Sequence, residues 1–266
     1  MATEEIFDRV MAEVMRKIEG NSASTSTPTA SPSPSYVPAM PEFVGTNPIG
    51  DTIGLVIPNV DQTLHEYMKI DRRFRSIGIL GGRTGAGPHI FAADEAIKAT
   101  NCEIVSIELP RDTQGGAGHG NLIVFGAEDV SDTRRAVEIA LEDLERTFGD
   151  VYANAAGHIE LQYTARAAGA LNRAFGAPIG KAFGIAVGAP AAIGVVMQDT
   201  AVKAANVDLI GYASPSSGTS FSNEVIGFYT GDSGAVRQAI RAARQVGVDL
   251  LRTMGDEPKT DFEPYI

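Results

Sequence analysis

Apolar and polar positions along this chain recur in the same order twice and describe two copies of one small unit. Apolar runs predict four strands per copy, at residues 53–56, 76–81, 103–108 and 121–125, and again at 159–162, 182–187, 207–212 and 225–230. Helices are predicted at 61–69, 94–101 and 126–144, and again at 166–175, 199–206 and 231–251. This order indicates an α+β fold with mixed strand pairing rather than a doubly wound sheet.

The internal repeat also sets the expected domain organisation. The segment DEAIKATN at 94–101 matches DTAVKAAN at 199–206, and a strand follows each segment. We therefore predict one domain at 45–150 and a second at 151–266, each close to the usual size of about 100 residues.

The residues before the repeats form a different kind of segment. Residues 1–20 predict an amphipathic helix, and 21–44 are rich in Ser, Thr and Pro, which predicts a flexible linker. A helix on such a tether either docks on its own domain or binds another protein. The apolar stripe that would make the contact includes Ile6, Phe7, Val10, Met11 and Val14.

Composition narrows the functional classes. A net charge of −11 argues against a nucleic-acid partner, because phosphate binding requires clustered Lys and Arg. The single cysteine, Cys102, excludes an internal disulfide framework and suits a reducing compartment, so cytoplasm is the default. Neither a signal peptide nor a membrane span is indicated, so we expect no membrane partner.

The sequence contains no recognisable motif for catalysis, nucleotide binding or metal binding. The glycine-rich segment at 81–89 follows a strand but has neither a dinucleotide fingerprint nor a P-loop. The four histidines are His65, His89, His119 and His158, and they lack metal-ligand spacing, so we expect no metal and no cofactor. The competing hypothesis is a small-anion or nucleotide-binding regulator or enzyme of ferredoxin-like build that uses this segment.

Two loops and two lysines occupy matching places in the copies. The loops are either mobile hairpins or pore linings, because their side chains can hydrogen-bond small polar solutes. Lys98 and Lys203 lie on the matching helices, either on a solvated face or in contact with a neighbouring molecule. The pore-lining candidates are Arg111, Asp112, Thr113 and Gln114 in the first loop and Ser214, Ser216, Ser217 and Thr219 in the second.

Residues 199–212 and 231–236 resemble the bacterial microcompartment shell domain, and residues 94–107 and 126–137 resemble it more weakly. The strand and helix before Ser76 and before Ala182 stand where a circularly permuted form of that domain carries them. Residues 42–266 are thus similar to the permuted tandem branch that serves propanediol and ethanol utilisation, with two ferredoxin-like shell domains.

This resemblance implies a structural protein without turnover, located in the shell of a cytoplasmic bacterial microcompartment. It implies a homotrimer, pseudohexameric in outline, that tiles the facet beside other shell proteins and passes small polar metabolites such as diols, glycerol and alcohols. It implies that Lys98 and Lys203 lie at the tile edge and that the N-terminal helix attaches enzyme cargo. An adaptor whose active part is that helix is a third hypothesis.

The resemblance leaves the route of passage open between the threefold axis and a channel within each subunit. For the second route, candidates at the junction of the two copies are Asp150, Tyr152, Asn154 and His158.

Overall fold

The structure is a computed structural model of the chain that describes residues 40–111, 118–219 and 222–266. These described residues belong to one compact unit. The predicted N-terminal helix and the first nineteen residues of the predicted linker lie outside the described residues, as do Asp112, Thr113 and Gln114.

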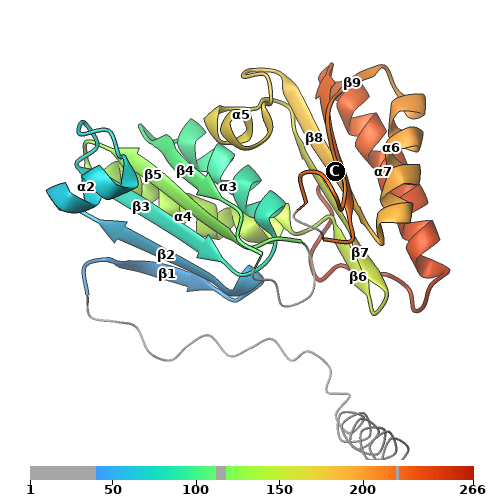
Figure 1. Cartoon of the computed structure of the whole chain (residues 1–266), viewed down its shortest axis with the longest axis horizontal. Coiled ribbons are helices and arrows are strands. Elements are labelled where there is room, and N and C mark those ends of the chain that lie inside the picture. The colour runs from blue at the N-terminus through green and yellow to red at the C-terminus, as the bar shows by residue number, and fades with distance from the viewer. Residues whose placement is uncertain (1–39, 112–117, 220–221) are drawn as a thin grey trace, which may run out of the picture. The chain divides into compact units, whose positions relative to one another are not determined.

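The first copy is one five-stranded sheet in the order β1-β2-β3-β5-β4. Two longer helices, α3 and α4, lie side by side against it, and the short helix α2 follows β2 (Figure 1). The elements are β1 (Phe43–Asn47), a 3-10 turn (Ile49–Asp51), β2 (Thr52–Ile57), α2 (Gln62–Met68), β3 (Ser76–Gly82), α3 (Ala86–Lys98), β4 (Glu103–Glu108), β5 (Asn121–Ala127) and α4 (Val130–Thr147).

The second copy repeats this topology, with sheet order β6-β7-β8-β10-β9 and helices α6 and α7 against the sheet. Its elements are β6 (Val151–Asn154), β7 (Gly157–Thr164), α5 (Gly169–Phe175), β8 (Ala182–Ala189), α6 (Ala191–Ala204), β9 (Val207–Ala213), β10 (Val225–Gly231) and α7 (Ser233–Arg252). All eight predicted strands are present, and the repeat is confirmed as two sheets of identical order.

Two sequence-based expectations about these sheets were wrong. Each sheet has five strands rather than four, because the short strands β1 and β6 precede the first predicted strand of each copy. The pairing between named strands is antiparallel throughout the described residues, not mixed. The reason is that β5 lies between β3 and β4, so the two parallel strands that α3 connects are never neighbours.

Close packing of the long helices on the sheets explains some of the small residues. In α4 the buried face includes Val137, Leu141 and Leu144, and it lies directly over β2 and β3. A Cβ atom on Gly54 of β2 would lie 2.5 Å from Cγ1 of Val137, so only glycine allows this approach. In α7 the corresponding face includes Val236 and Ile240.

Candidate functional site at the junction of the two copies

The two copies meet where α5 of the second copy packs on α3 and β4 of the first. Leu171 of α5 is completely buried and belongs to the same apolar cluster as Phe91 and Leu80 of the first copy. Three residues of the first copy that pack against this cluster are Ile97, Ile104 and Ile107. The junction is therefore a shared hydrophobic core rather than a hinge.

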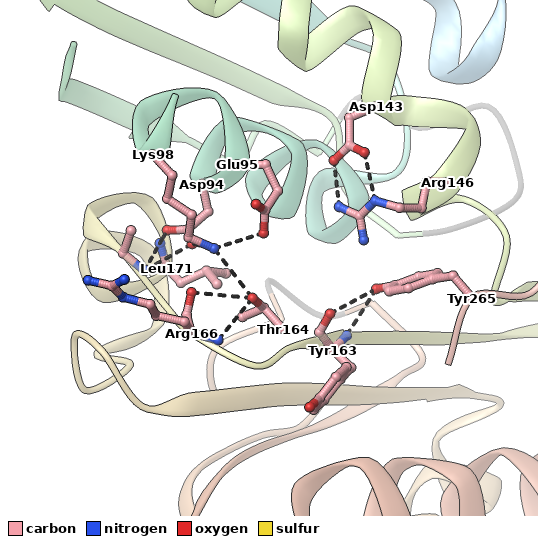
Figure 2. Close-up of polar contacts among 11 residues, drawn as sticks. Asp94, Glu95, Lys98, Asp143, Arg146, Tyr163, Thr164, Arg166, Leu171 and Tyr265 are labelled. Atoms are coloured by element: carbon pink, nitrogen blue, oxygen red, sulfur yellow. Dashed lines mark hydrogen bonds and ion pairs between the residues drawn. The ribbon is translucent and has the colours of Figure 1, made fainter. Parts of the chain in front are cut away.

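A buried carboxylate locks this junction (Figure 2). Asp94 of α3 accepts hydrogen bonds from the backbone N–H of Ala168, at 2.9 Å, and of Leu171, at 3.1 Å. These are donors of the first turn of α5, a helix without a side-chain N-cap of its own. Lys98 completes the arrangement, with its Nζ 3.0 Å from Asp94 and 2.8 Å from Glu95. Asp94 thus serves as the N-cap of a helix in the other copy.

A matching apolar face on the second copy is exposed. By sequence and strand register, Val202 of α6 corresponds to Ile97, and Leu209 and Tyr212 of β9 correspond to Ile104 and Ile107. All three are exposed large hydrophobic residues, with Tyr212 at 50% of its full surface. We call Val202, Leu209 and Tyr212 the open face.

The counterpart of α5 on the first copy is also exposed. Helices α2 and α5 both have seven residues and end at a left-handed C-cap residue, Lys69 and Gly176. Aligning these caps places Leu64 at the position of Leu171 and Tyr67 at that of Ala174. Leu64 is exposed and Tyr67 is 83% exposed. Both halves of the junction therefore recur on the surface without a partner in the described residues.

The predicted tile-edge lysines occupy different environments. The Lys98 side chain is only 24% exposed, because Asp94, Glu95 and Thr164 surround it at the junction. The Lys203 side chain is 72% exposed and pairs with Asp199 at 2.6 Å. The matching helix positions are confirmed, and the tile-edge role stays a prediction.

The polar loop candidates divide into tied and exposed side chains. Thr219 is buried, and its hydroxyl donates to the carbonyl of Ser214, at 2.7 Å, inside the loop. Ser216 and Ser217 are exposed. Arg111 is exposed at the end of the first loop. Ser214 is half-buried, so among the described candidates Ser214, Ser216, Ser217 and Arg111 keep surface that could meet a passing solute.

Most of the junction candidates anchor the C-terminal segment. The buried Asp150 carboxylate accepts hydrogen bonds from Arg244 at 2.6 Å and from the backbone N–H groups of Tyr265 and Ile266 at 2.9 and 3.0 Å. The Tyr152 hydroxyl donates to Asp150 at 3.3 Å. Asn154 donates to the carbonyls of Leu251 and Asp256. His158 alone faces a different group of polar side chains.

That group, which the sequence did not reveal, is a polar cluster of His119, His158, Glu160 and Glu224 inside the junction. Nε2 of His119 lies 3.5 Å from Glu224, and Nε2 of His158 lies 3.7 Å from it. Glu160 and Glu224 are 3% and 2% exposed. Nδ1 of His119, Nε2 of His158 and Oε1 of Glu224 are buried without a hydrogen-bond partner.

Burial of Glu160 raises its pKa well above the usual value of 4.5, and the nearby Glu224 raises it further. The signal in the sequence was a carboxylate between the two apolar residues Ile159 and Leu161 of β7. Alternation alone would direct that side chain towards solvent, so its burial could not be predicted from the strand pattern.

The glycine-rich segment leaves little room for an anion. A Cβ atom on Gly87, in the first turn of α3, would lie 2.0 Å from Oε1 of Glu160, so a carboxyl group already occupies the space beside this turn. His89 is completely buried and bonds Thr52 at 2.7 Å. This packing weighs against a nucleotide or phosphate site.

The described residues contain no group of three or more His, Cys, Asp and Glu side chains that could hold a metal ion. Of the helices in those residues, none has the length and apolar character needed to cross a membrane.

Comparison with known proteins identifies the domain. The family model of the BMC domain matches residues 76–159 and 182–255. Each match begins at the third strand of a sheet, and the first extends into the strands that open the second sheet. This offset agrees with the circular permutation that the sequence resemblance implied.

Similar proteins that are matched over most or all of their length support the same assignment. The chain is 59% identical to the bacterial microcompartment shell protein PduB of Citrobacter freundii over 275 residues, covering 100% of both chains. A crystal structure of a trimeric bacterial microcompartment shell protein PduB matches with a TM-score of 0.83 and 57% identity, over 85% of this chain and 100% of that chain. EtuB from Clostridium kluyveri matches with a TM-score of 0.83 and 54% identity, over 86% of this chain and 100% of that chain. The protein therefore belongs to the bacterial microcompartment shell proteins, as a member that carries the BMC domain twice.

Proposed function

We propose that this protein is a trimeric tile of the microcompartment shell, in which the open face of one subunit receives α2 of the next. The observation that carries this proposal is the exposed repeat of the junction. Val202, Leu209 and Tyr212 reproduce the face that covers α5 inside the chain, and Leu64 and Tyr67 reproduce the side of α5 that packs on that face. A head-to-tail interface of this kind closes into a ring when its rotation permits.

The trimer is the closed form that we propose, since six domains with similar junctions would give a pseudohexameric outline. The solved relative described as a trimeric PduB supports this number of subunits. Substitution of charge into an apolar interface costs several kcal/mol for each unpaired buried group. A single such substitution changes all three interfaces of the ring, so it should be enough to dissociate the trimer.

The test compares Leu209→Glu and Tyr67→Glu with the control Val130→Glu, which changes an exposed apolar residue at the start of α4. Light scattering of the wild-type protein and the control should give about three times 28.0 kDa. The two interface variants should shift towards 28.0 kDa while keeping their far-ultraviolet circular dichroism. Trimers of unchanged mass in both variants would refute this interface.

We further propose that the assembled tile passes small polar metabolites such as diols, glycerol and alcohols, without turnover. The exposed hydroxyls of Ser216 and Ser217 and the exposed Arg111 support a polar rim. Replacing both serines by leucine should slow entry of glycerol into reconstituted shells without changing assembly. Equal entry rates would exclude the second loop from the route.

The N-terminal helix is proposed to attach enzyme cargo through Ile6, Phe7, Val10, Met11 and Val14. Its apolar stripe and the composition of the linker support this role. Deleting residues 1–20 should leave the trimer and its sheets intact while co-purification of cargo enzymes is lost. Loss of sheets instead would make the helix part of the assembly interface.

Contact with other shell proteins is proposed to involve Lys203 at the tile edge. Its high exposure on α6 supports this placement. The change Lys203→Glu should preserve the trimer but reduce two-dimensional arrays in electron micrographs. Because Lys98 is enclosed at the junction, Lys98→Glu should instead impair folding of the subunit.

A further inference from the structure

Two buried carboxyl groups face a small, partly open cavity between the copies. Glu160 and Glu224 line this cavity of about 50 Å³ together with His119, and its other walls include Leu109, Phe175 and Phe228. No lysine or arginine lines it in the described part of the chain. Burying an unpaired carboxylate is costly, so the site requires a positive charge or a proton.

The repeat provides an internal control for these acids. Glu160 pairs with Val187 across the β7–β8 ladder, and Ile53 occupies the equivalent position, opposite Gly81. Glu224 precedes Val225, whose counterpart is Asn121, so Gly120 stands in its place in the first copy. The fold therefore tolerates uncharged residues at both positions, and the acids are a feature of this junction alone.

The neighbours of Glu160 explain why a proton fits best. Glu224 comes from the segment before β10, His158 from β7 and His119 from the segment before β5. On α3, the titratable neighbour is His89, whose Nε2 is bonded to Thr52. Both histidines of the cluster approach Glu224, and no hydrogen bond joins either to Glu160. Glu160 is thus the carboxyl group of the pair that no histidine of the cluster approaches.

We propose that Glu160 holds a proton in the closed junction and releases it as the pH rises, so that packing between the two copies is proton-linked. On release, the O–H bond of the carboxyl group breaks, the proton goes to solvent, and two carboxylates remain in one apolar cavity. Their repulsion and desolvation favour separation of α5 from α3. Burial and Glu224 both raise the pKa of Glu160, consistent with a neutral acid in the folded state.

The sign of the effect follows from proton linkage. Between the unfolded pKa near 4.5 and the raised folded pKa, the folded chain binds more protons than the unfolded chain. Stability from this group is therefore present at low pH and is lost as the pH rises. Glu160→Gln keeps the shape of the neutral acid but cannot ionise. The ratio of its folding equilibrium constant to that of wild type should therefore rise with pH, by up to tenfold per pH unit.

The experiment measures urea unfolding of the full-length protein from about pH 5 to about pH 9. Glu160→Gln is compared with wild type and with Glu145→Gln, which removes an exposed carboxylate from α4. Hydrogen exchange at the amides of Ala168 and Leu171 gives a local readout, because Asp94 protects them only in the closed junction. Their exchange, corrected for the intrinsic pH dependence, should speed up with pH in wild type and not in Glu160→Gln.

If the ratio of the folding equilibrium constants of Glu160→Gln and wild type stays constant across this pH range, the proposal is overturned. A wild-type profile that follows potassium or sodium concentration rather than pH would also overturn it, because a bound cation would then neutralise the cavity. If Glu160→Gln does not fold, Glu160→Ile, which copies Ile53, provides the same comparison. This inference does not depend on the proposed trimer, since it concerns a junction within one chain.

Discussion

Helices α2 and α5 occupy the same place in the two copies but are completed in different ways. The first turn of α5 has no cap of its own and takes the carboxylate of Asp94 from the other copy. The first turn of α2 is capped locally, because Asp61 accepts a hydrogen bond from the backbone N–H of Thr63 at 2.8 Å. One helix depends on its neighbour and the other does not.

This difference distinguishes a permanent junction from a surface that awaits a partner. The junction within the chain forms at the high effective concentration of linked domains, so it can bury Asp94 and Leu171. The proposed outer interface must persist in water before assembly, which requires a helix with satisfied end groups. Its exposed apolar side chains then supply the attraction between subunits.

The largest effect should come from Asp94→Ala. Removing this buried carboxylate takes one of its two ion pairs from Lys98 and leaves two amides of α5 unpaired, so the free energy of unfolding should fall by about 4 kcal/mol. The matched change Asp199→Ala removes an exposed acid and should cost less than about 0.5 kcal/mol. Urea denaturation of both variants measures the two losses of unfolding free energy. Similar losses would contradict the distinction between the buried junction at Asp94 and the exposed face at Asp199.

A somewhat smaller effect is expected from Leu171→Ala, which empties a fully buried site. The expected loss is about 3 kcal/mol, from lost burial and the cavity left behind. Leu64→Ala, at the equivalent exposed position, should hardly change unfolding of the subunit but should weaken the proposed trimer. Analytical ultracentrifugation would measure the association of each variant. A Leu64→Ala variant that forms trimers as well as wild type would contradict the proposal that Leu64 plays the part of Leu171 between subunits.

Acid should destabilise the first copy through His89, whose counterpart in α6 is Gly194. Burial lowers the pKa of His89 from 6.5 to about 4, so the folded chain resists a proton that the unfolded chain accepts. Its stabilising contribution is complete above pH 6.5 and declines as the pH falls towards 4, by roughly 1 kcal/mol per pH unit. In thermal melts, His89→Gln should flatten this slope, and an unchanged slope would assign acid sensitivity to another group.

The smallest contrast concerns the two lysines. Lys98→Met keeps the aliphatic stem but removes the charge beside Asp94, and it should cost about 1 kcal/mol of unfolding free energy. Lys203→Met should lie within about 0.5 kcal/mol of wild type, because an exposed ion pair contributes little. Denaturation in low and high salt provides the check. A strong salt dependence for Lys203 would show that its pair with Asp199 contributes more than its exposure indicates.

Some elements escaped prediction for physical reasons. The strands β1 and β6 have only five and four residues, and they contain small and polar residues. Each is a strand because β2 or β7 offers a free edge to pair with, and that edge exists only in the folded sheet. The antiparallel pairing was missed because the insertion of β5 between β3 and β4 is not a local property of any segment.

The sequence by itself determined the repeat, the eight longer strands, the α+β class and the resemblance to the shell domain, since these depend on local periodicity and on motifs. Only the tertiary structure decided that Asp94 caps a helix of the other copy, that Lys98 is enclosed while Lys203 is exposed, and that Glu160 is buried. These outcomes arise from contacts between residues far apart in the chain. The residues next to a charged side chain in the sequence do not indicate which partner or cavity it will contact in the folded protein.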